Sequence, residues 1–283
     1  MTSAAAGKAD DAHARRRVAR QRRLDWVFAR PAAFGAFAAV TLATASLGPT
    51  WLLLVSVVLL QVGLTRGWLR LLSVPSPIGA GIVGMGAGLT VDLLLVFHGT
   101  KDPLRDMGLV LAFSLLAGLV HQISRADRVG LTQSLSATLA LAGLTVSASA
   151  YLAMPDVHDT GALVLLGLAA ARVVARAVDT IVQRRQGTVT RRRWFGVAVG
   201  ILASGAVGPL VLHATTLAVP SRAILIAAPA AVLLIVGTLL ERTATGERRR
   251  SAVGAVLVTL PLGIAAPAAY LVAQTLLRSS GSG

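Results

Sequence analysis

The sequence predicts an all-α membrane protein, a bundle of about nine transmembrane helices with a cytoplasmic N-terminus. Hydrophobic residues make up 55% of the 283-residue chain, charged residues make up 14%, and the mean hydropathy is +0.73. A water-soluble domain of this size needs more polar surface around its core. The apolar residues also fall in runs of about 20 residues, the length that crosses a bilayer. Finally, the basic residues gather in alternate loops, as the positive-inside rule requires.

The chain divides into three regions. Residues 1–23 form a polar, arginine-rich tail that we expect to be disordered. Residues 24–278 form the membrane domain, and residues 279–283 form a short flexible end. The arginines of the tail run into Trp26 and Phe28, a pattern that suits a helix lying on an anionic lipid surface. The alternative is that these arginines only set the topology.

Nine membrane spans account best for the positions of the basic residues. With the N-terminus in the cytoplasm, the outer segments carry only Lys101, Arg105, Arg222 and Arg278, and the other basic loop residues lie on the cytoplasmic side. The C-terminus is then outside. A signal peptide ending near residues 43–45 is an alternative that leaves the remaining topology unchanged. The expected spans are 31–48, 50–65, 77–98, 107–123, 131–153, 161–183, 194–213, 222–240 and 252–277.

Composition narrows the expected partners. The formal charge is +15, but the basic clusters lie at membrane ends and lack interleaved aromatic residues, so we expect no nucleic acid. The expected partners are the lipid bilayer, with anionic headgroups at the cytoplasmic arginine clusters, and other membrane proteins or a second copy. Lys8 and Lys101 are the only lysines. In this arginine- and alanine-rich composition the chain resembles uncharacterised multi-span proteins of high-GC actinobacteria, which implies a bacterial plasma membrane.

Small residues spaced four apart form rows on three of the expected spans. Helices in lipid associate through such residues, so we expect the rows to face neighbouring helices. The hydroxyl-rich row of the fifth span is alternatively the lining of a polar pathway, although hydroxyls often bond back to their own helix. Several later spans contain proline, which kinks helices and in transporters exposes backbone dipoles. The rows are Ala80, Gly84 and Gly88; Ser134, Thr138, Ala142, Thr145 and Ser149; and Gly196, Gly200, Ser204 and Gly208.

Asp92 continues the row of the third span by one more step of four. A charge in the middle of a span costs about 2.5–3.5 kcal/mol, so it needs a partner or a proton. The sixth span offers Arg172, Arg176 and Asp179, which share one helical face. These four residues are the predicted intramembrane polar site. Two interpretations stay open, a substrate or proton site between the third and sixth spans, and a buried ion pair that fixes helix register.

No motif predicts a metal or cofactor site. His98, His158 and His213 all map near the outer surface, with Asp102 close in sequence to the first of them and Asp156 and Asp159 close to the second. They come from separate loops without a ligand spacing such as H-x-x-x-H, so we expect ordinary loop histidines. The absence of cysteine excludes thiolate ligands and disulfides. We therefore expect no metal, no cofactor and no catalytic residue.

The segment after the eighth span runs Glu241-Arg242-Thr243-Ala244-Thr245-Gly246-Glu247 and continues with Arg248 to Arg250. In length and expected helix number the chain resembles, in outline, the phosphatidate cytidylyltransferases, which are integral-membrane lipid enzymes. That resemblance implies a cytoplasmic Ser/Lys-Arg/Lys-Asp and Gly-His-Gly-Gly-x-x-Asp-Arg signature in this region. The segment here departs from it, so no catalytic residue carries over.

The expected activity is that of a small-molecule or lipid-associated transporter or permease. The first alternative is a non-catalytic membrane partner or scaffold that docks through its small-residue rows and basic loops. The second alternative is an integral-membrane lipid-modifying enzyme. Clustered carboxylates that would hold Mg²⁺ for phosphoryl transfer are too few in the cytoplasmic loops, which makes the enzyme the weakest of the three.

Overall fold

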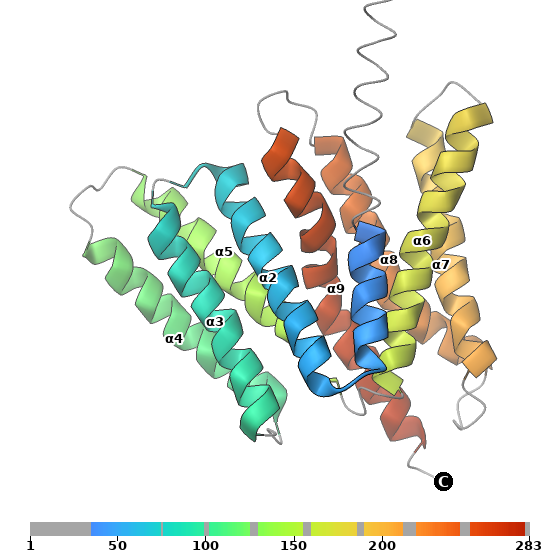
Figure 1. The fold of residues 1–283 in the computed structure, drawn as a ribbon, viewed down its shortest axis with the longest axis horizontal. Helices are drawn as coiled ribbons and strands as arrows, with labels where there is room; N and C mark the ends of the chain where they lie inside the picture. The colour runs from blue at the N-terminus through green and yellow to red at the C-terminus, as the bar shows by residue number, and fades with distance from the viewer. Residues whose placement is uncertain are drawn as a thin grey trace, which may run out of the picture.

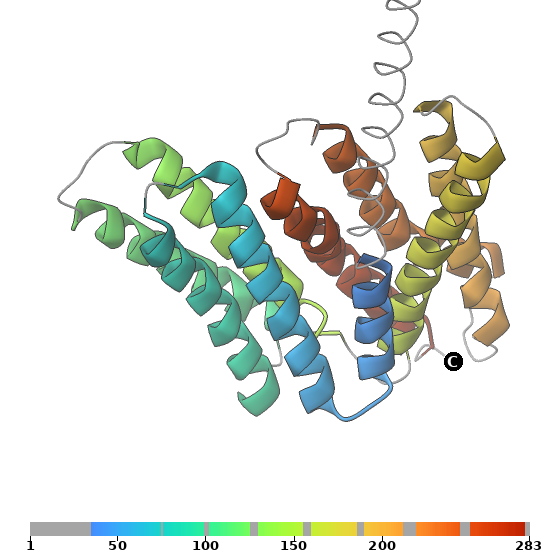
Figure 2. The same cartoon turned by 45° about the horizontal axis from the view of Figure 1, so that its top comes forward.

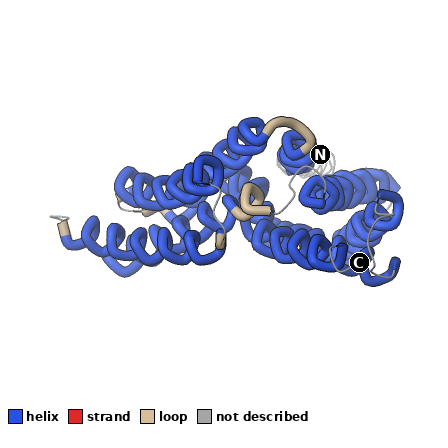
Figure 3. The backbone as a smooth tube through the Cα atoms, turned by 90° about the horizontal axis from the view of Figure 1, so that it is seen from below, coloured by secondary structure: helices blue, strands red, loops and turns tan. Residues whose placement is uncertain are grey.

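The computed structural model describes residues 35–74, 76–98, 102–124, 130–154, 160–185, 190–211, 219–243 and 250–280. Within these ranges the chain is helical and contains no strand (Figure 3). The tail of residues 1–23 and residues 281–283 lie outside them. The N-terminal helix, Gly35–Ser46, is followed by α2 (Thr50–Leu72), α3 (Pro77–His98), α4 (Pro103–Ile123), α5 (Leu131–Ser149), α6 (Ala162–Arg185), α7 (Thr190–Val211), α8 (Val219–Thr243) and α9 (Arg250–Ser280).

The all-α prediction is confirmed for the described residues, and each expected span coincides with one helix. Six helices are long and apolar enough to cross a membrane: α2, α3, α4, α5, and the stretches Ser221–Leu240 of α8 and Val256–Ser279 of α9. Gly35–Ser46 and Trp194–Val207 are shorter apolar helices. The remaining helix, α6, has 24 residues but carries three charged residues in its apolar stretch. The described helices therefore suit a membrane protein.

The helices form two groups (Figures 1 and 2). In the first group α3 packs against α2, α4 and α5; in the second α7 packs against α6 and α8. Helix α9 contacts α2 and α5 on one side and α6 and α8 on the other. The apolar stretch of α9 is 72% buried, whereas that of α4 is only 28% buried. Thus α9 is the central helix of the bundle and α4 lies at its edge.

The exposed surface of α4 is apolar. Leu104, Leu109, Phe113, Leu116 and Val120 are each about half exposed or more. A soluble protein rarely leaves such a continuous apolar face in water, whereas a face of this kind is normal against lipid tails.

The turn between α2 and α3 explains where α2 ends. Ser73 adopts a left-handed backbone with φ 48°, and its N–H and that of Val74 donate to the carbonyls of Arg70 and Leu69. These bonds satisfy carbonyls that the last turn of α2 would otherwise leave open. Helix α5 begins after Gly130, whose φ of 68° is a conformation that glycine adopts without strain.

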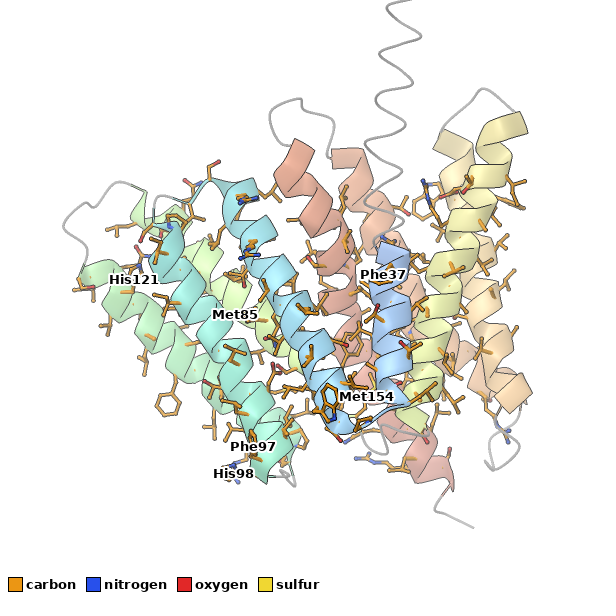
Figure 4. The ribbon with its side chains drawn as sticks, viewed as in Figure 1. Phe37, Met85, Phe97, His98, His121 and Met154 are labelled. Carbon is orange, nitrogen blue, oxygen red and sulfur yellow. The ribbon has the colours of Figure 1, made fainter. Side chains whose placement is uncertain are left out.

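Polar contacts tie the ends of α2, α4 and α5 together. The indole N–H of Trp68 donates to the carbonyl of Ala137 at 3.0 Å, and the amide of Gln122 donates to the hydroxyl of Ser134 at 2.8 Å. The His121 imidazole lies directly over Gly79, where a Cβ would collide with it. His121 and His98 lie at opposite ends of the bundle (Figure 4).

Candidate functional site

The small-residue row of α3 packs against the hydroxyl row of α5. A Cβ on Gly84 would lie 2.5 Å from Cγ of Leu141, and a Cβ on Gly88 would lie 2.9 Å from Cβ of Thr145. The Thr145 hydroxyl donates to the carbonyl of Gly84 at 2.6 Å. The two helices approach this closely because α3 has no side chain at these two positions. All five residues of the α5 row, Ser134, Thr138, Ala142, Thr145 and Ser149, are buried.

Asp92 lies one turn beyond Gly88 and is fully buried. The side chains of Ser149 on α5 and Gln61 on α2 adjoin its carboxyl group. Neither carboxylate oxygen, however, has a hydrogen-bond partner in the described part of the structure. An ionised carboxylate in this environment is expensive, because burial removes its hydration and no described side chain hydrogen-bonds to it.

Gln61 is also fully buried, and its orientation is determined by its neighbours. Its Nε2 donates to the carbonyl of Thr145 and to the hydroxyl oxygen of Ser149, both at 3.2 Å. A flipped amide would place Oε1 against the Thr145 carbonyl, which brings two acceptors together. In the observed orientation Oε1 has no partner. We call Gln61, Asp92, Thr145 and Ser149 the buried carboxyl cluster.

The cluster has more acceptors than donors. Both Nε2 hydrogens of Gln61 are already donated to acceptors, and the Thr145 hydroxyl donates its hydrogen to the carbonyl of Gly84. As a donor, the Ser149 hydroxyl makes only long bonds, 3.4 Å, to the carbonyls of Gly88 and Thr145. Three buried oxygens remain unpartnered, two on Asp92 and one on Gln61. What such a cluster lacks is a positive charge or an additional donor hydrogen.

Arg172 lies elsewhere, between α6, α8, α9 and the N-terminal helix. It is 9% exposed, and its Nη2 donates to the carbonyl of Leu257 at 3.4 Å. Pro261, four residues later, has no N–H, so the helix itself leaves that carbonyl without its usual donor. Gly35 and Gly237 make room for the guanidinium, since a Cβ on either would lie within 3.0 Å of it. Arg172 therefore compensates for a proline inside α9.

Among the described side chains of α6, the Asp179 carboxylate faces α7. Asp179 packs over Gly196, where a Cβ would collide with its carboxylate, and Arg176 is half-buried. A Cβ on Gly200 would lie 2.7 Å from the carbonyl of Ala171, so the backbones of α6 and α7 touch there.

The last two residues of the α7 row reach different surroundings. Ser204 is buried, and its hydroxyl donates to the carbonyl of Ile226 at 3.4 Å. This bond joins α7 to α8. Gly208 belongs to α7, but its packing is not among the described features.

The four residues of the predicted polar site therefore occupy two places. Asp92 belongs to the cluster between α2, α3 and α5, and Arg172 belongs to the junction of α6, α8 and α9, so the two do not hydrogen-bond. Arg176 and Asp179 follow Arg172 along α6. Among the described residues no group of three His, Asp or Glu could hold a metal ion. His98 is exposed, and His158 and His213 lie outside the described residues.

No family model, curated protein or solved structure matches this chain.

In the sequence analysis Gln61 is not singled out, and Pro261 predicts only a kink in its helix. Gln61 interrupts an otherwise apolar stretch of α2, and an isolated amide in a span is a signal of a buried polar contact. Pro261 frees the carbonyl four residues before it, and that spacing marks Leu257 as an acceptor for a buried donor. Both signals are local, but neither identifies the partner on the other helix.

Proposed function

We propose that the protein is a permease of the bacterial plasma membrane for a small or lipid-associated substrate, and that a positive charge binds at Asp92 during transport. The observation that carries this proposal is the fully buried Asp92 carboxyl, whose two oxygens have no partner among the described residues. An ionisable group that is kept at such a cost inside a membrane usually belongs to a substrate, ion or proton path.

The proposed topology has nine spans, with the N-terminus in the cytoplasm and the C-terminus outside. The six long apolar helices account for six spans, and the N-terminal helix, α6 and α7 would supply the others. The charges of α6 are compatible with a span, because Arg172 is buried among other helices and Asp179 packs over Gly196. In this topology the arginine clusters meet anionic lipid headgroups on the cytoplasmic side.

Cysteine labelling tests the topology directly, because the chain has no cysteine of its own. We expect a membrane-impermeant maleimide to label Thr100→Cys, between α3 and α4, in intact cells. The same reagent should label Thr188→Cys, between α6 and α7, only after the cells are opened. Labelling of Thr188→Cys in intact cells would contradict the orientation, and with it the assignment of every cytoplasmic loop.

The small-residue rows favour a permease over a scaffold. Gly84, Gly88, Gly196 and Gly200 all contact other helices of the same chain. A scaffold that docks through such rows would present them on the outside. The described glycines with open space around them are single ones, Gly86 on α3, Gly108 on α4 and Gly143 on α5.

Charge movement tests the transport function even while the substrate is unidentified. Purified protein is reconstituted in proteoliposomes on a solid-supported membrane, and pools of amino acids, sugars, small organic acids and lysolipids are applied. We expect at least one pool to produce a transient current. Asp92→Asn, which keeps the shape of the side chain but cannot ionise, should reduce that current at least about tenfold, a change equal to about 1.4 kcal/mol.

Two results of that experiment would count against the permease. One is the absence of any protein-dependent current with every pool, which would favour the scaffold. The other is a current that Asp92→Asn leaves unchanged. Gln133→Glu serves as the control, because Gln133 is exposed and lies at the other end of the same helix group.

A further inference from the structure

The buried carboxyl cluster holds three unpartnered oxygens on two neighbouring side chains. A water molecule could donate to two of them, but it would not neutralise an ionised Asp92. Inside a membrane protein, an uncompensated charge costs more free energy than an unmade hydrogen bond. The missing group therefore carries a positive charge, and two kinds of occupant remain, a metal cation and a proton.

The contacts of Gln61 argue against a metal cation. A hard cation replaces its water with about six oxygen ligands. The cluster offers only three unpartnered oxygens, two on Asp92 and Oε1 of Gln61. The carbonyl of Thr145 and the hydroxyl of Ser149 already accept hydrogens from Gln61. Space is also short, because a Cβ on Gly88 would lie 2.9 Å from Cδ and Nε2 of Gln61. A proton needs one oxygen and no added volume.

Few charged groups surround Asp92. Helix α5 carries none between Leu131 and Ser149. On α2, Arg66 is exposed and lies five residues, about 7.5 Å along the axis, beyond Gln61. The remaining titratable residues on α3 and its neighbours all lie in the end turns of their helices. They are Arg70 on α2, His98 on α3, and Arg105, Asp106 and His121 on α4.

We propose that the buried carboxyl cluster is an exchangeable proton site that does not bind Na⁺. In the occupied state the proton is bonded to one Asp92 oxygen, and that O–H donates to an acceptor of the cluster. On release the O–H bond breaks, the electron pair stays on the carboxylate, and the proton passes to water. The inference rests on the proposed permease, for which it names the coupling ion.

A carbodiimide tests the site chemically. A protonated carboxyl adds its oxygen to the carbodiimide carbon while its proton passes to nitrogen, and the acyl group then moves to nitrogen to give a stable acylurea. The tryptic peptide Leu71–Lys101 contains Asp92 as its only Asp or Glu. An apolar carbodiimide, applied to the whole protein in liposomes, should therefore add one reagent mass to this peptide. Labelling should be strong in acidic buffer and weak in alkaline buffer, and should be equal in sodium and choline chloride.

Three controls determine what the labelling means. Asp92→Asn should abolish it. A water-soluble carbodiimide with an added amine should modify the exposed Asp102 and spare Asp92. If the apolar reagent does not reach the site, infrared difference spectra between acidic and alkaline buffer give the answer. We expect a carbonyl band of a protonated carboxylic acid that wild type shows and Asp92→Asn lacks.

Three outcomes would contradict the proton site. Protection by sodium but not by choline would identify Na⁺ as the occupant. Labelling and infrared bands that do not change with pH would mean a permanently neutral residue with a structural role. A carboxylate that stays ionised in acidic buffer would exclude a proton altogether. The expected labelling without any substrate-induced current would leave the proton site in place and refute only the permease.

Discussion

Replacing Tyr151 with alanine should lower the free energy of unfolding by about 3 kcal/mol. Tyr151 follows α5, is fully buried, and is among the largest buried side chains. Its hydroxyl donates to the carbonyl of Leu262 on α9 at 2.7 Å. Truncation would leave a cavity at the contact between α9 and the first helix group. We place the cost at the lower end of the range for soluble cores, because the unfolded helices remain in lipid.

Tyr151→Phe separates the ring from the hydroxyl. It keeps the packing and loses one hydrogen bond between helices, which inside membranes is worth about 0.6 kcal/mol on average. Unfolding in mixed detergent micelles with increasing dodecyl sulfate measures both variants. Equal effects of phenylalanine and alanine would show that the hydrogen bond, and not the filled volume, matters at this position.

Replacing Arg172 with methionine should cost about 1.5–3 kcal/mol, the range for a hydrogen bond from a charged donor. Methionine keeps an apolar stem but leaves the carbonyl of Leu257 without a donor. Pro261→Ala restores a backbone N–H to that carbonyl, so the penalty of Arg172→Met should shrink when both changes are combined. The same micelle unfolding assay measures the two single variants and the double variant, which together give the coupling energy.

Arg222 provides a matched control for this cycle. It is also 9% exposed, but it lies fifteen residues before Gly237 on α8, about 22 Å along the helix axis. The effects of Arg222→Met and Pro261→Ala should therefore add. Additivity in the Arg172 cycle would contradict the role of the guanidinium at the proline.

Most of the fold could be predicted from the sequence, because in lipid a run of apolar residues has few alternatives to a helix. The bounds of α3, Pro77–His98, match the expected span at both ends. The largest difference is at α2, which continues to Leu72 instead of ending near residue 65. The polar residues Arg66 and Arg70 indicated a loop there, but as exposed residues in the last turns of a helix they reach the surface without breaking it.

The candidate site could be predicted only in part. The spacing of Gly84, Gly88 and Asp92 indicates that they share one face, because that relation depends on the period of a single helix. Which helix meets that face depends on how the whole bundle packs. Asp92 meets Gln61 and Ser149, on helices without an opposite charge next to it, whereas charge complementarity had indicated Arg172 on α6. The two do not meet because Arg172 lies at the junction of α6, α8 and α9, whereas Asp92 lies between α2, α3 and α5.

The position of α9 has a mechanical consequence. Among α2–α9, helix α9 connects the two helix groups, because it packs against α2 and α5 of the first and against α6 and α8 of the second. The same helix contains Pro261 and Pro267 in its interior, and each removes one rung of its hydrogen-bond ladder. A helix that lacks two backbone hydrogen bonds bends more readily than its neighbours. A rotation of one helix group relative to the other would therefore bend α9 at these prolines. It would also lengthen the hydrogen bond from Arg172 to the carbonyl of Leu257.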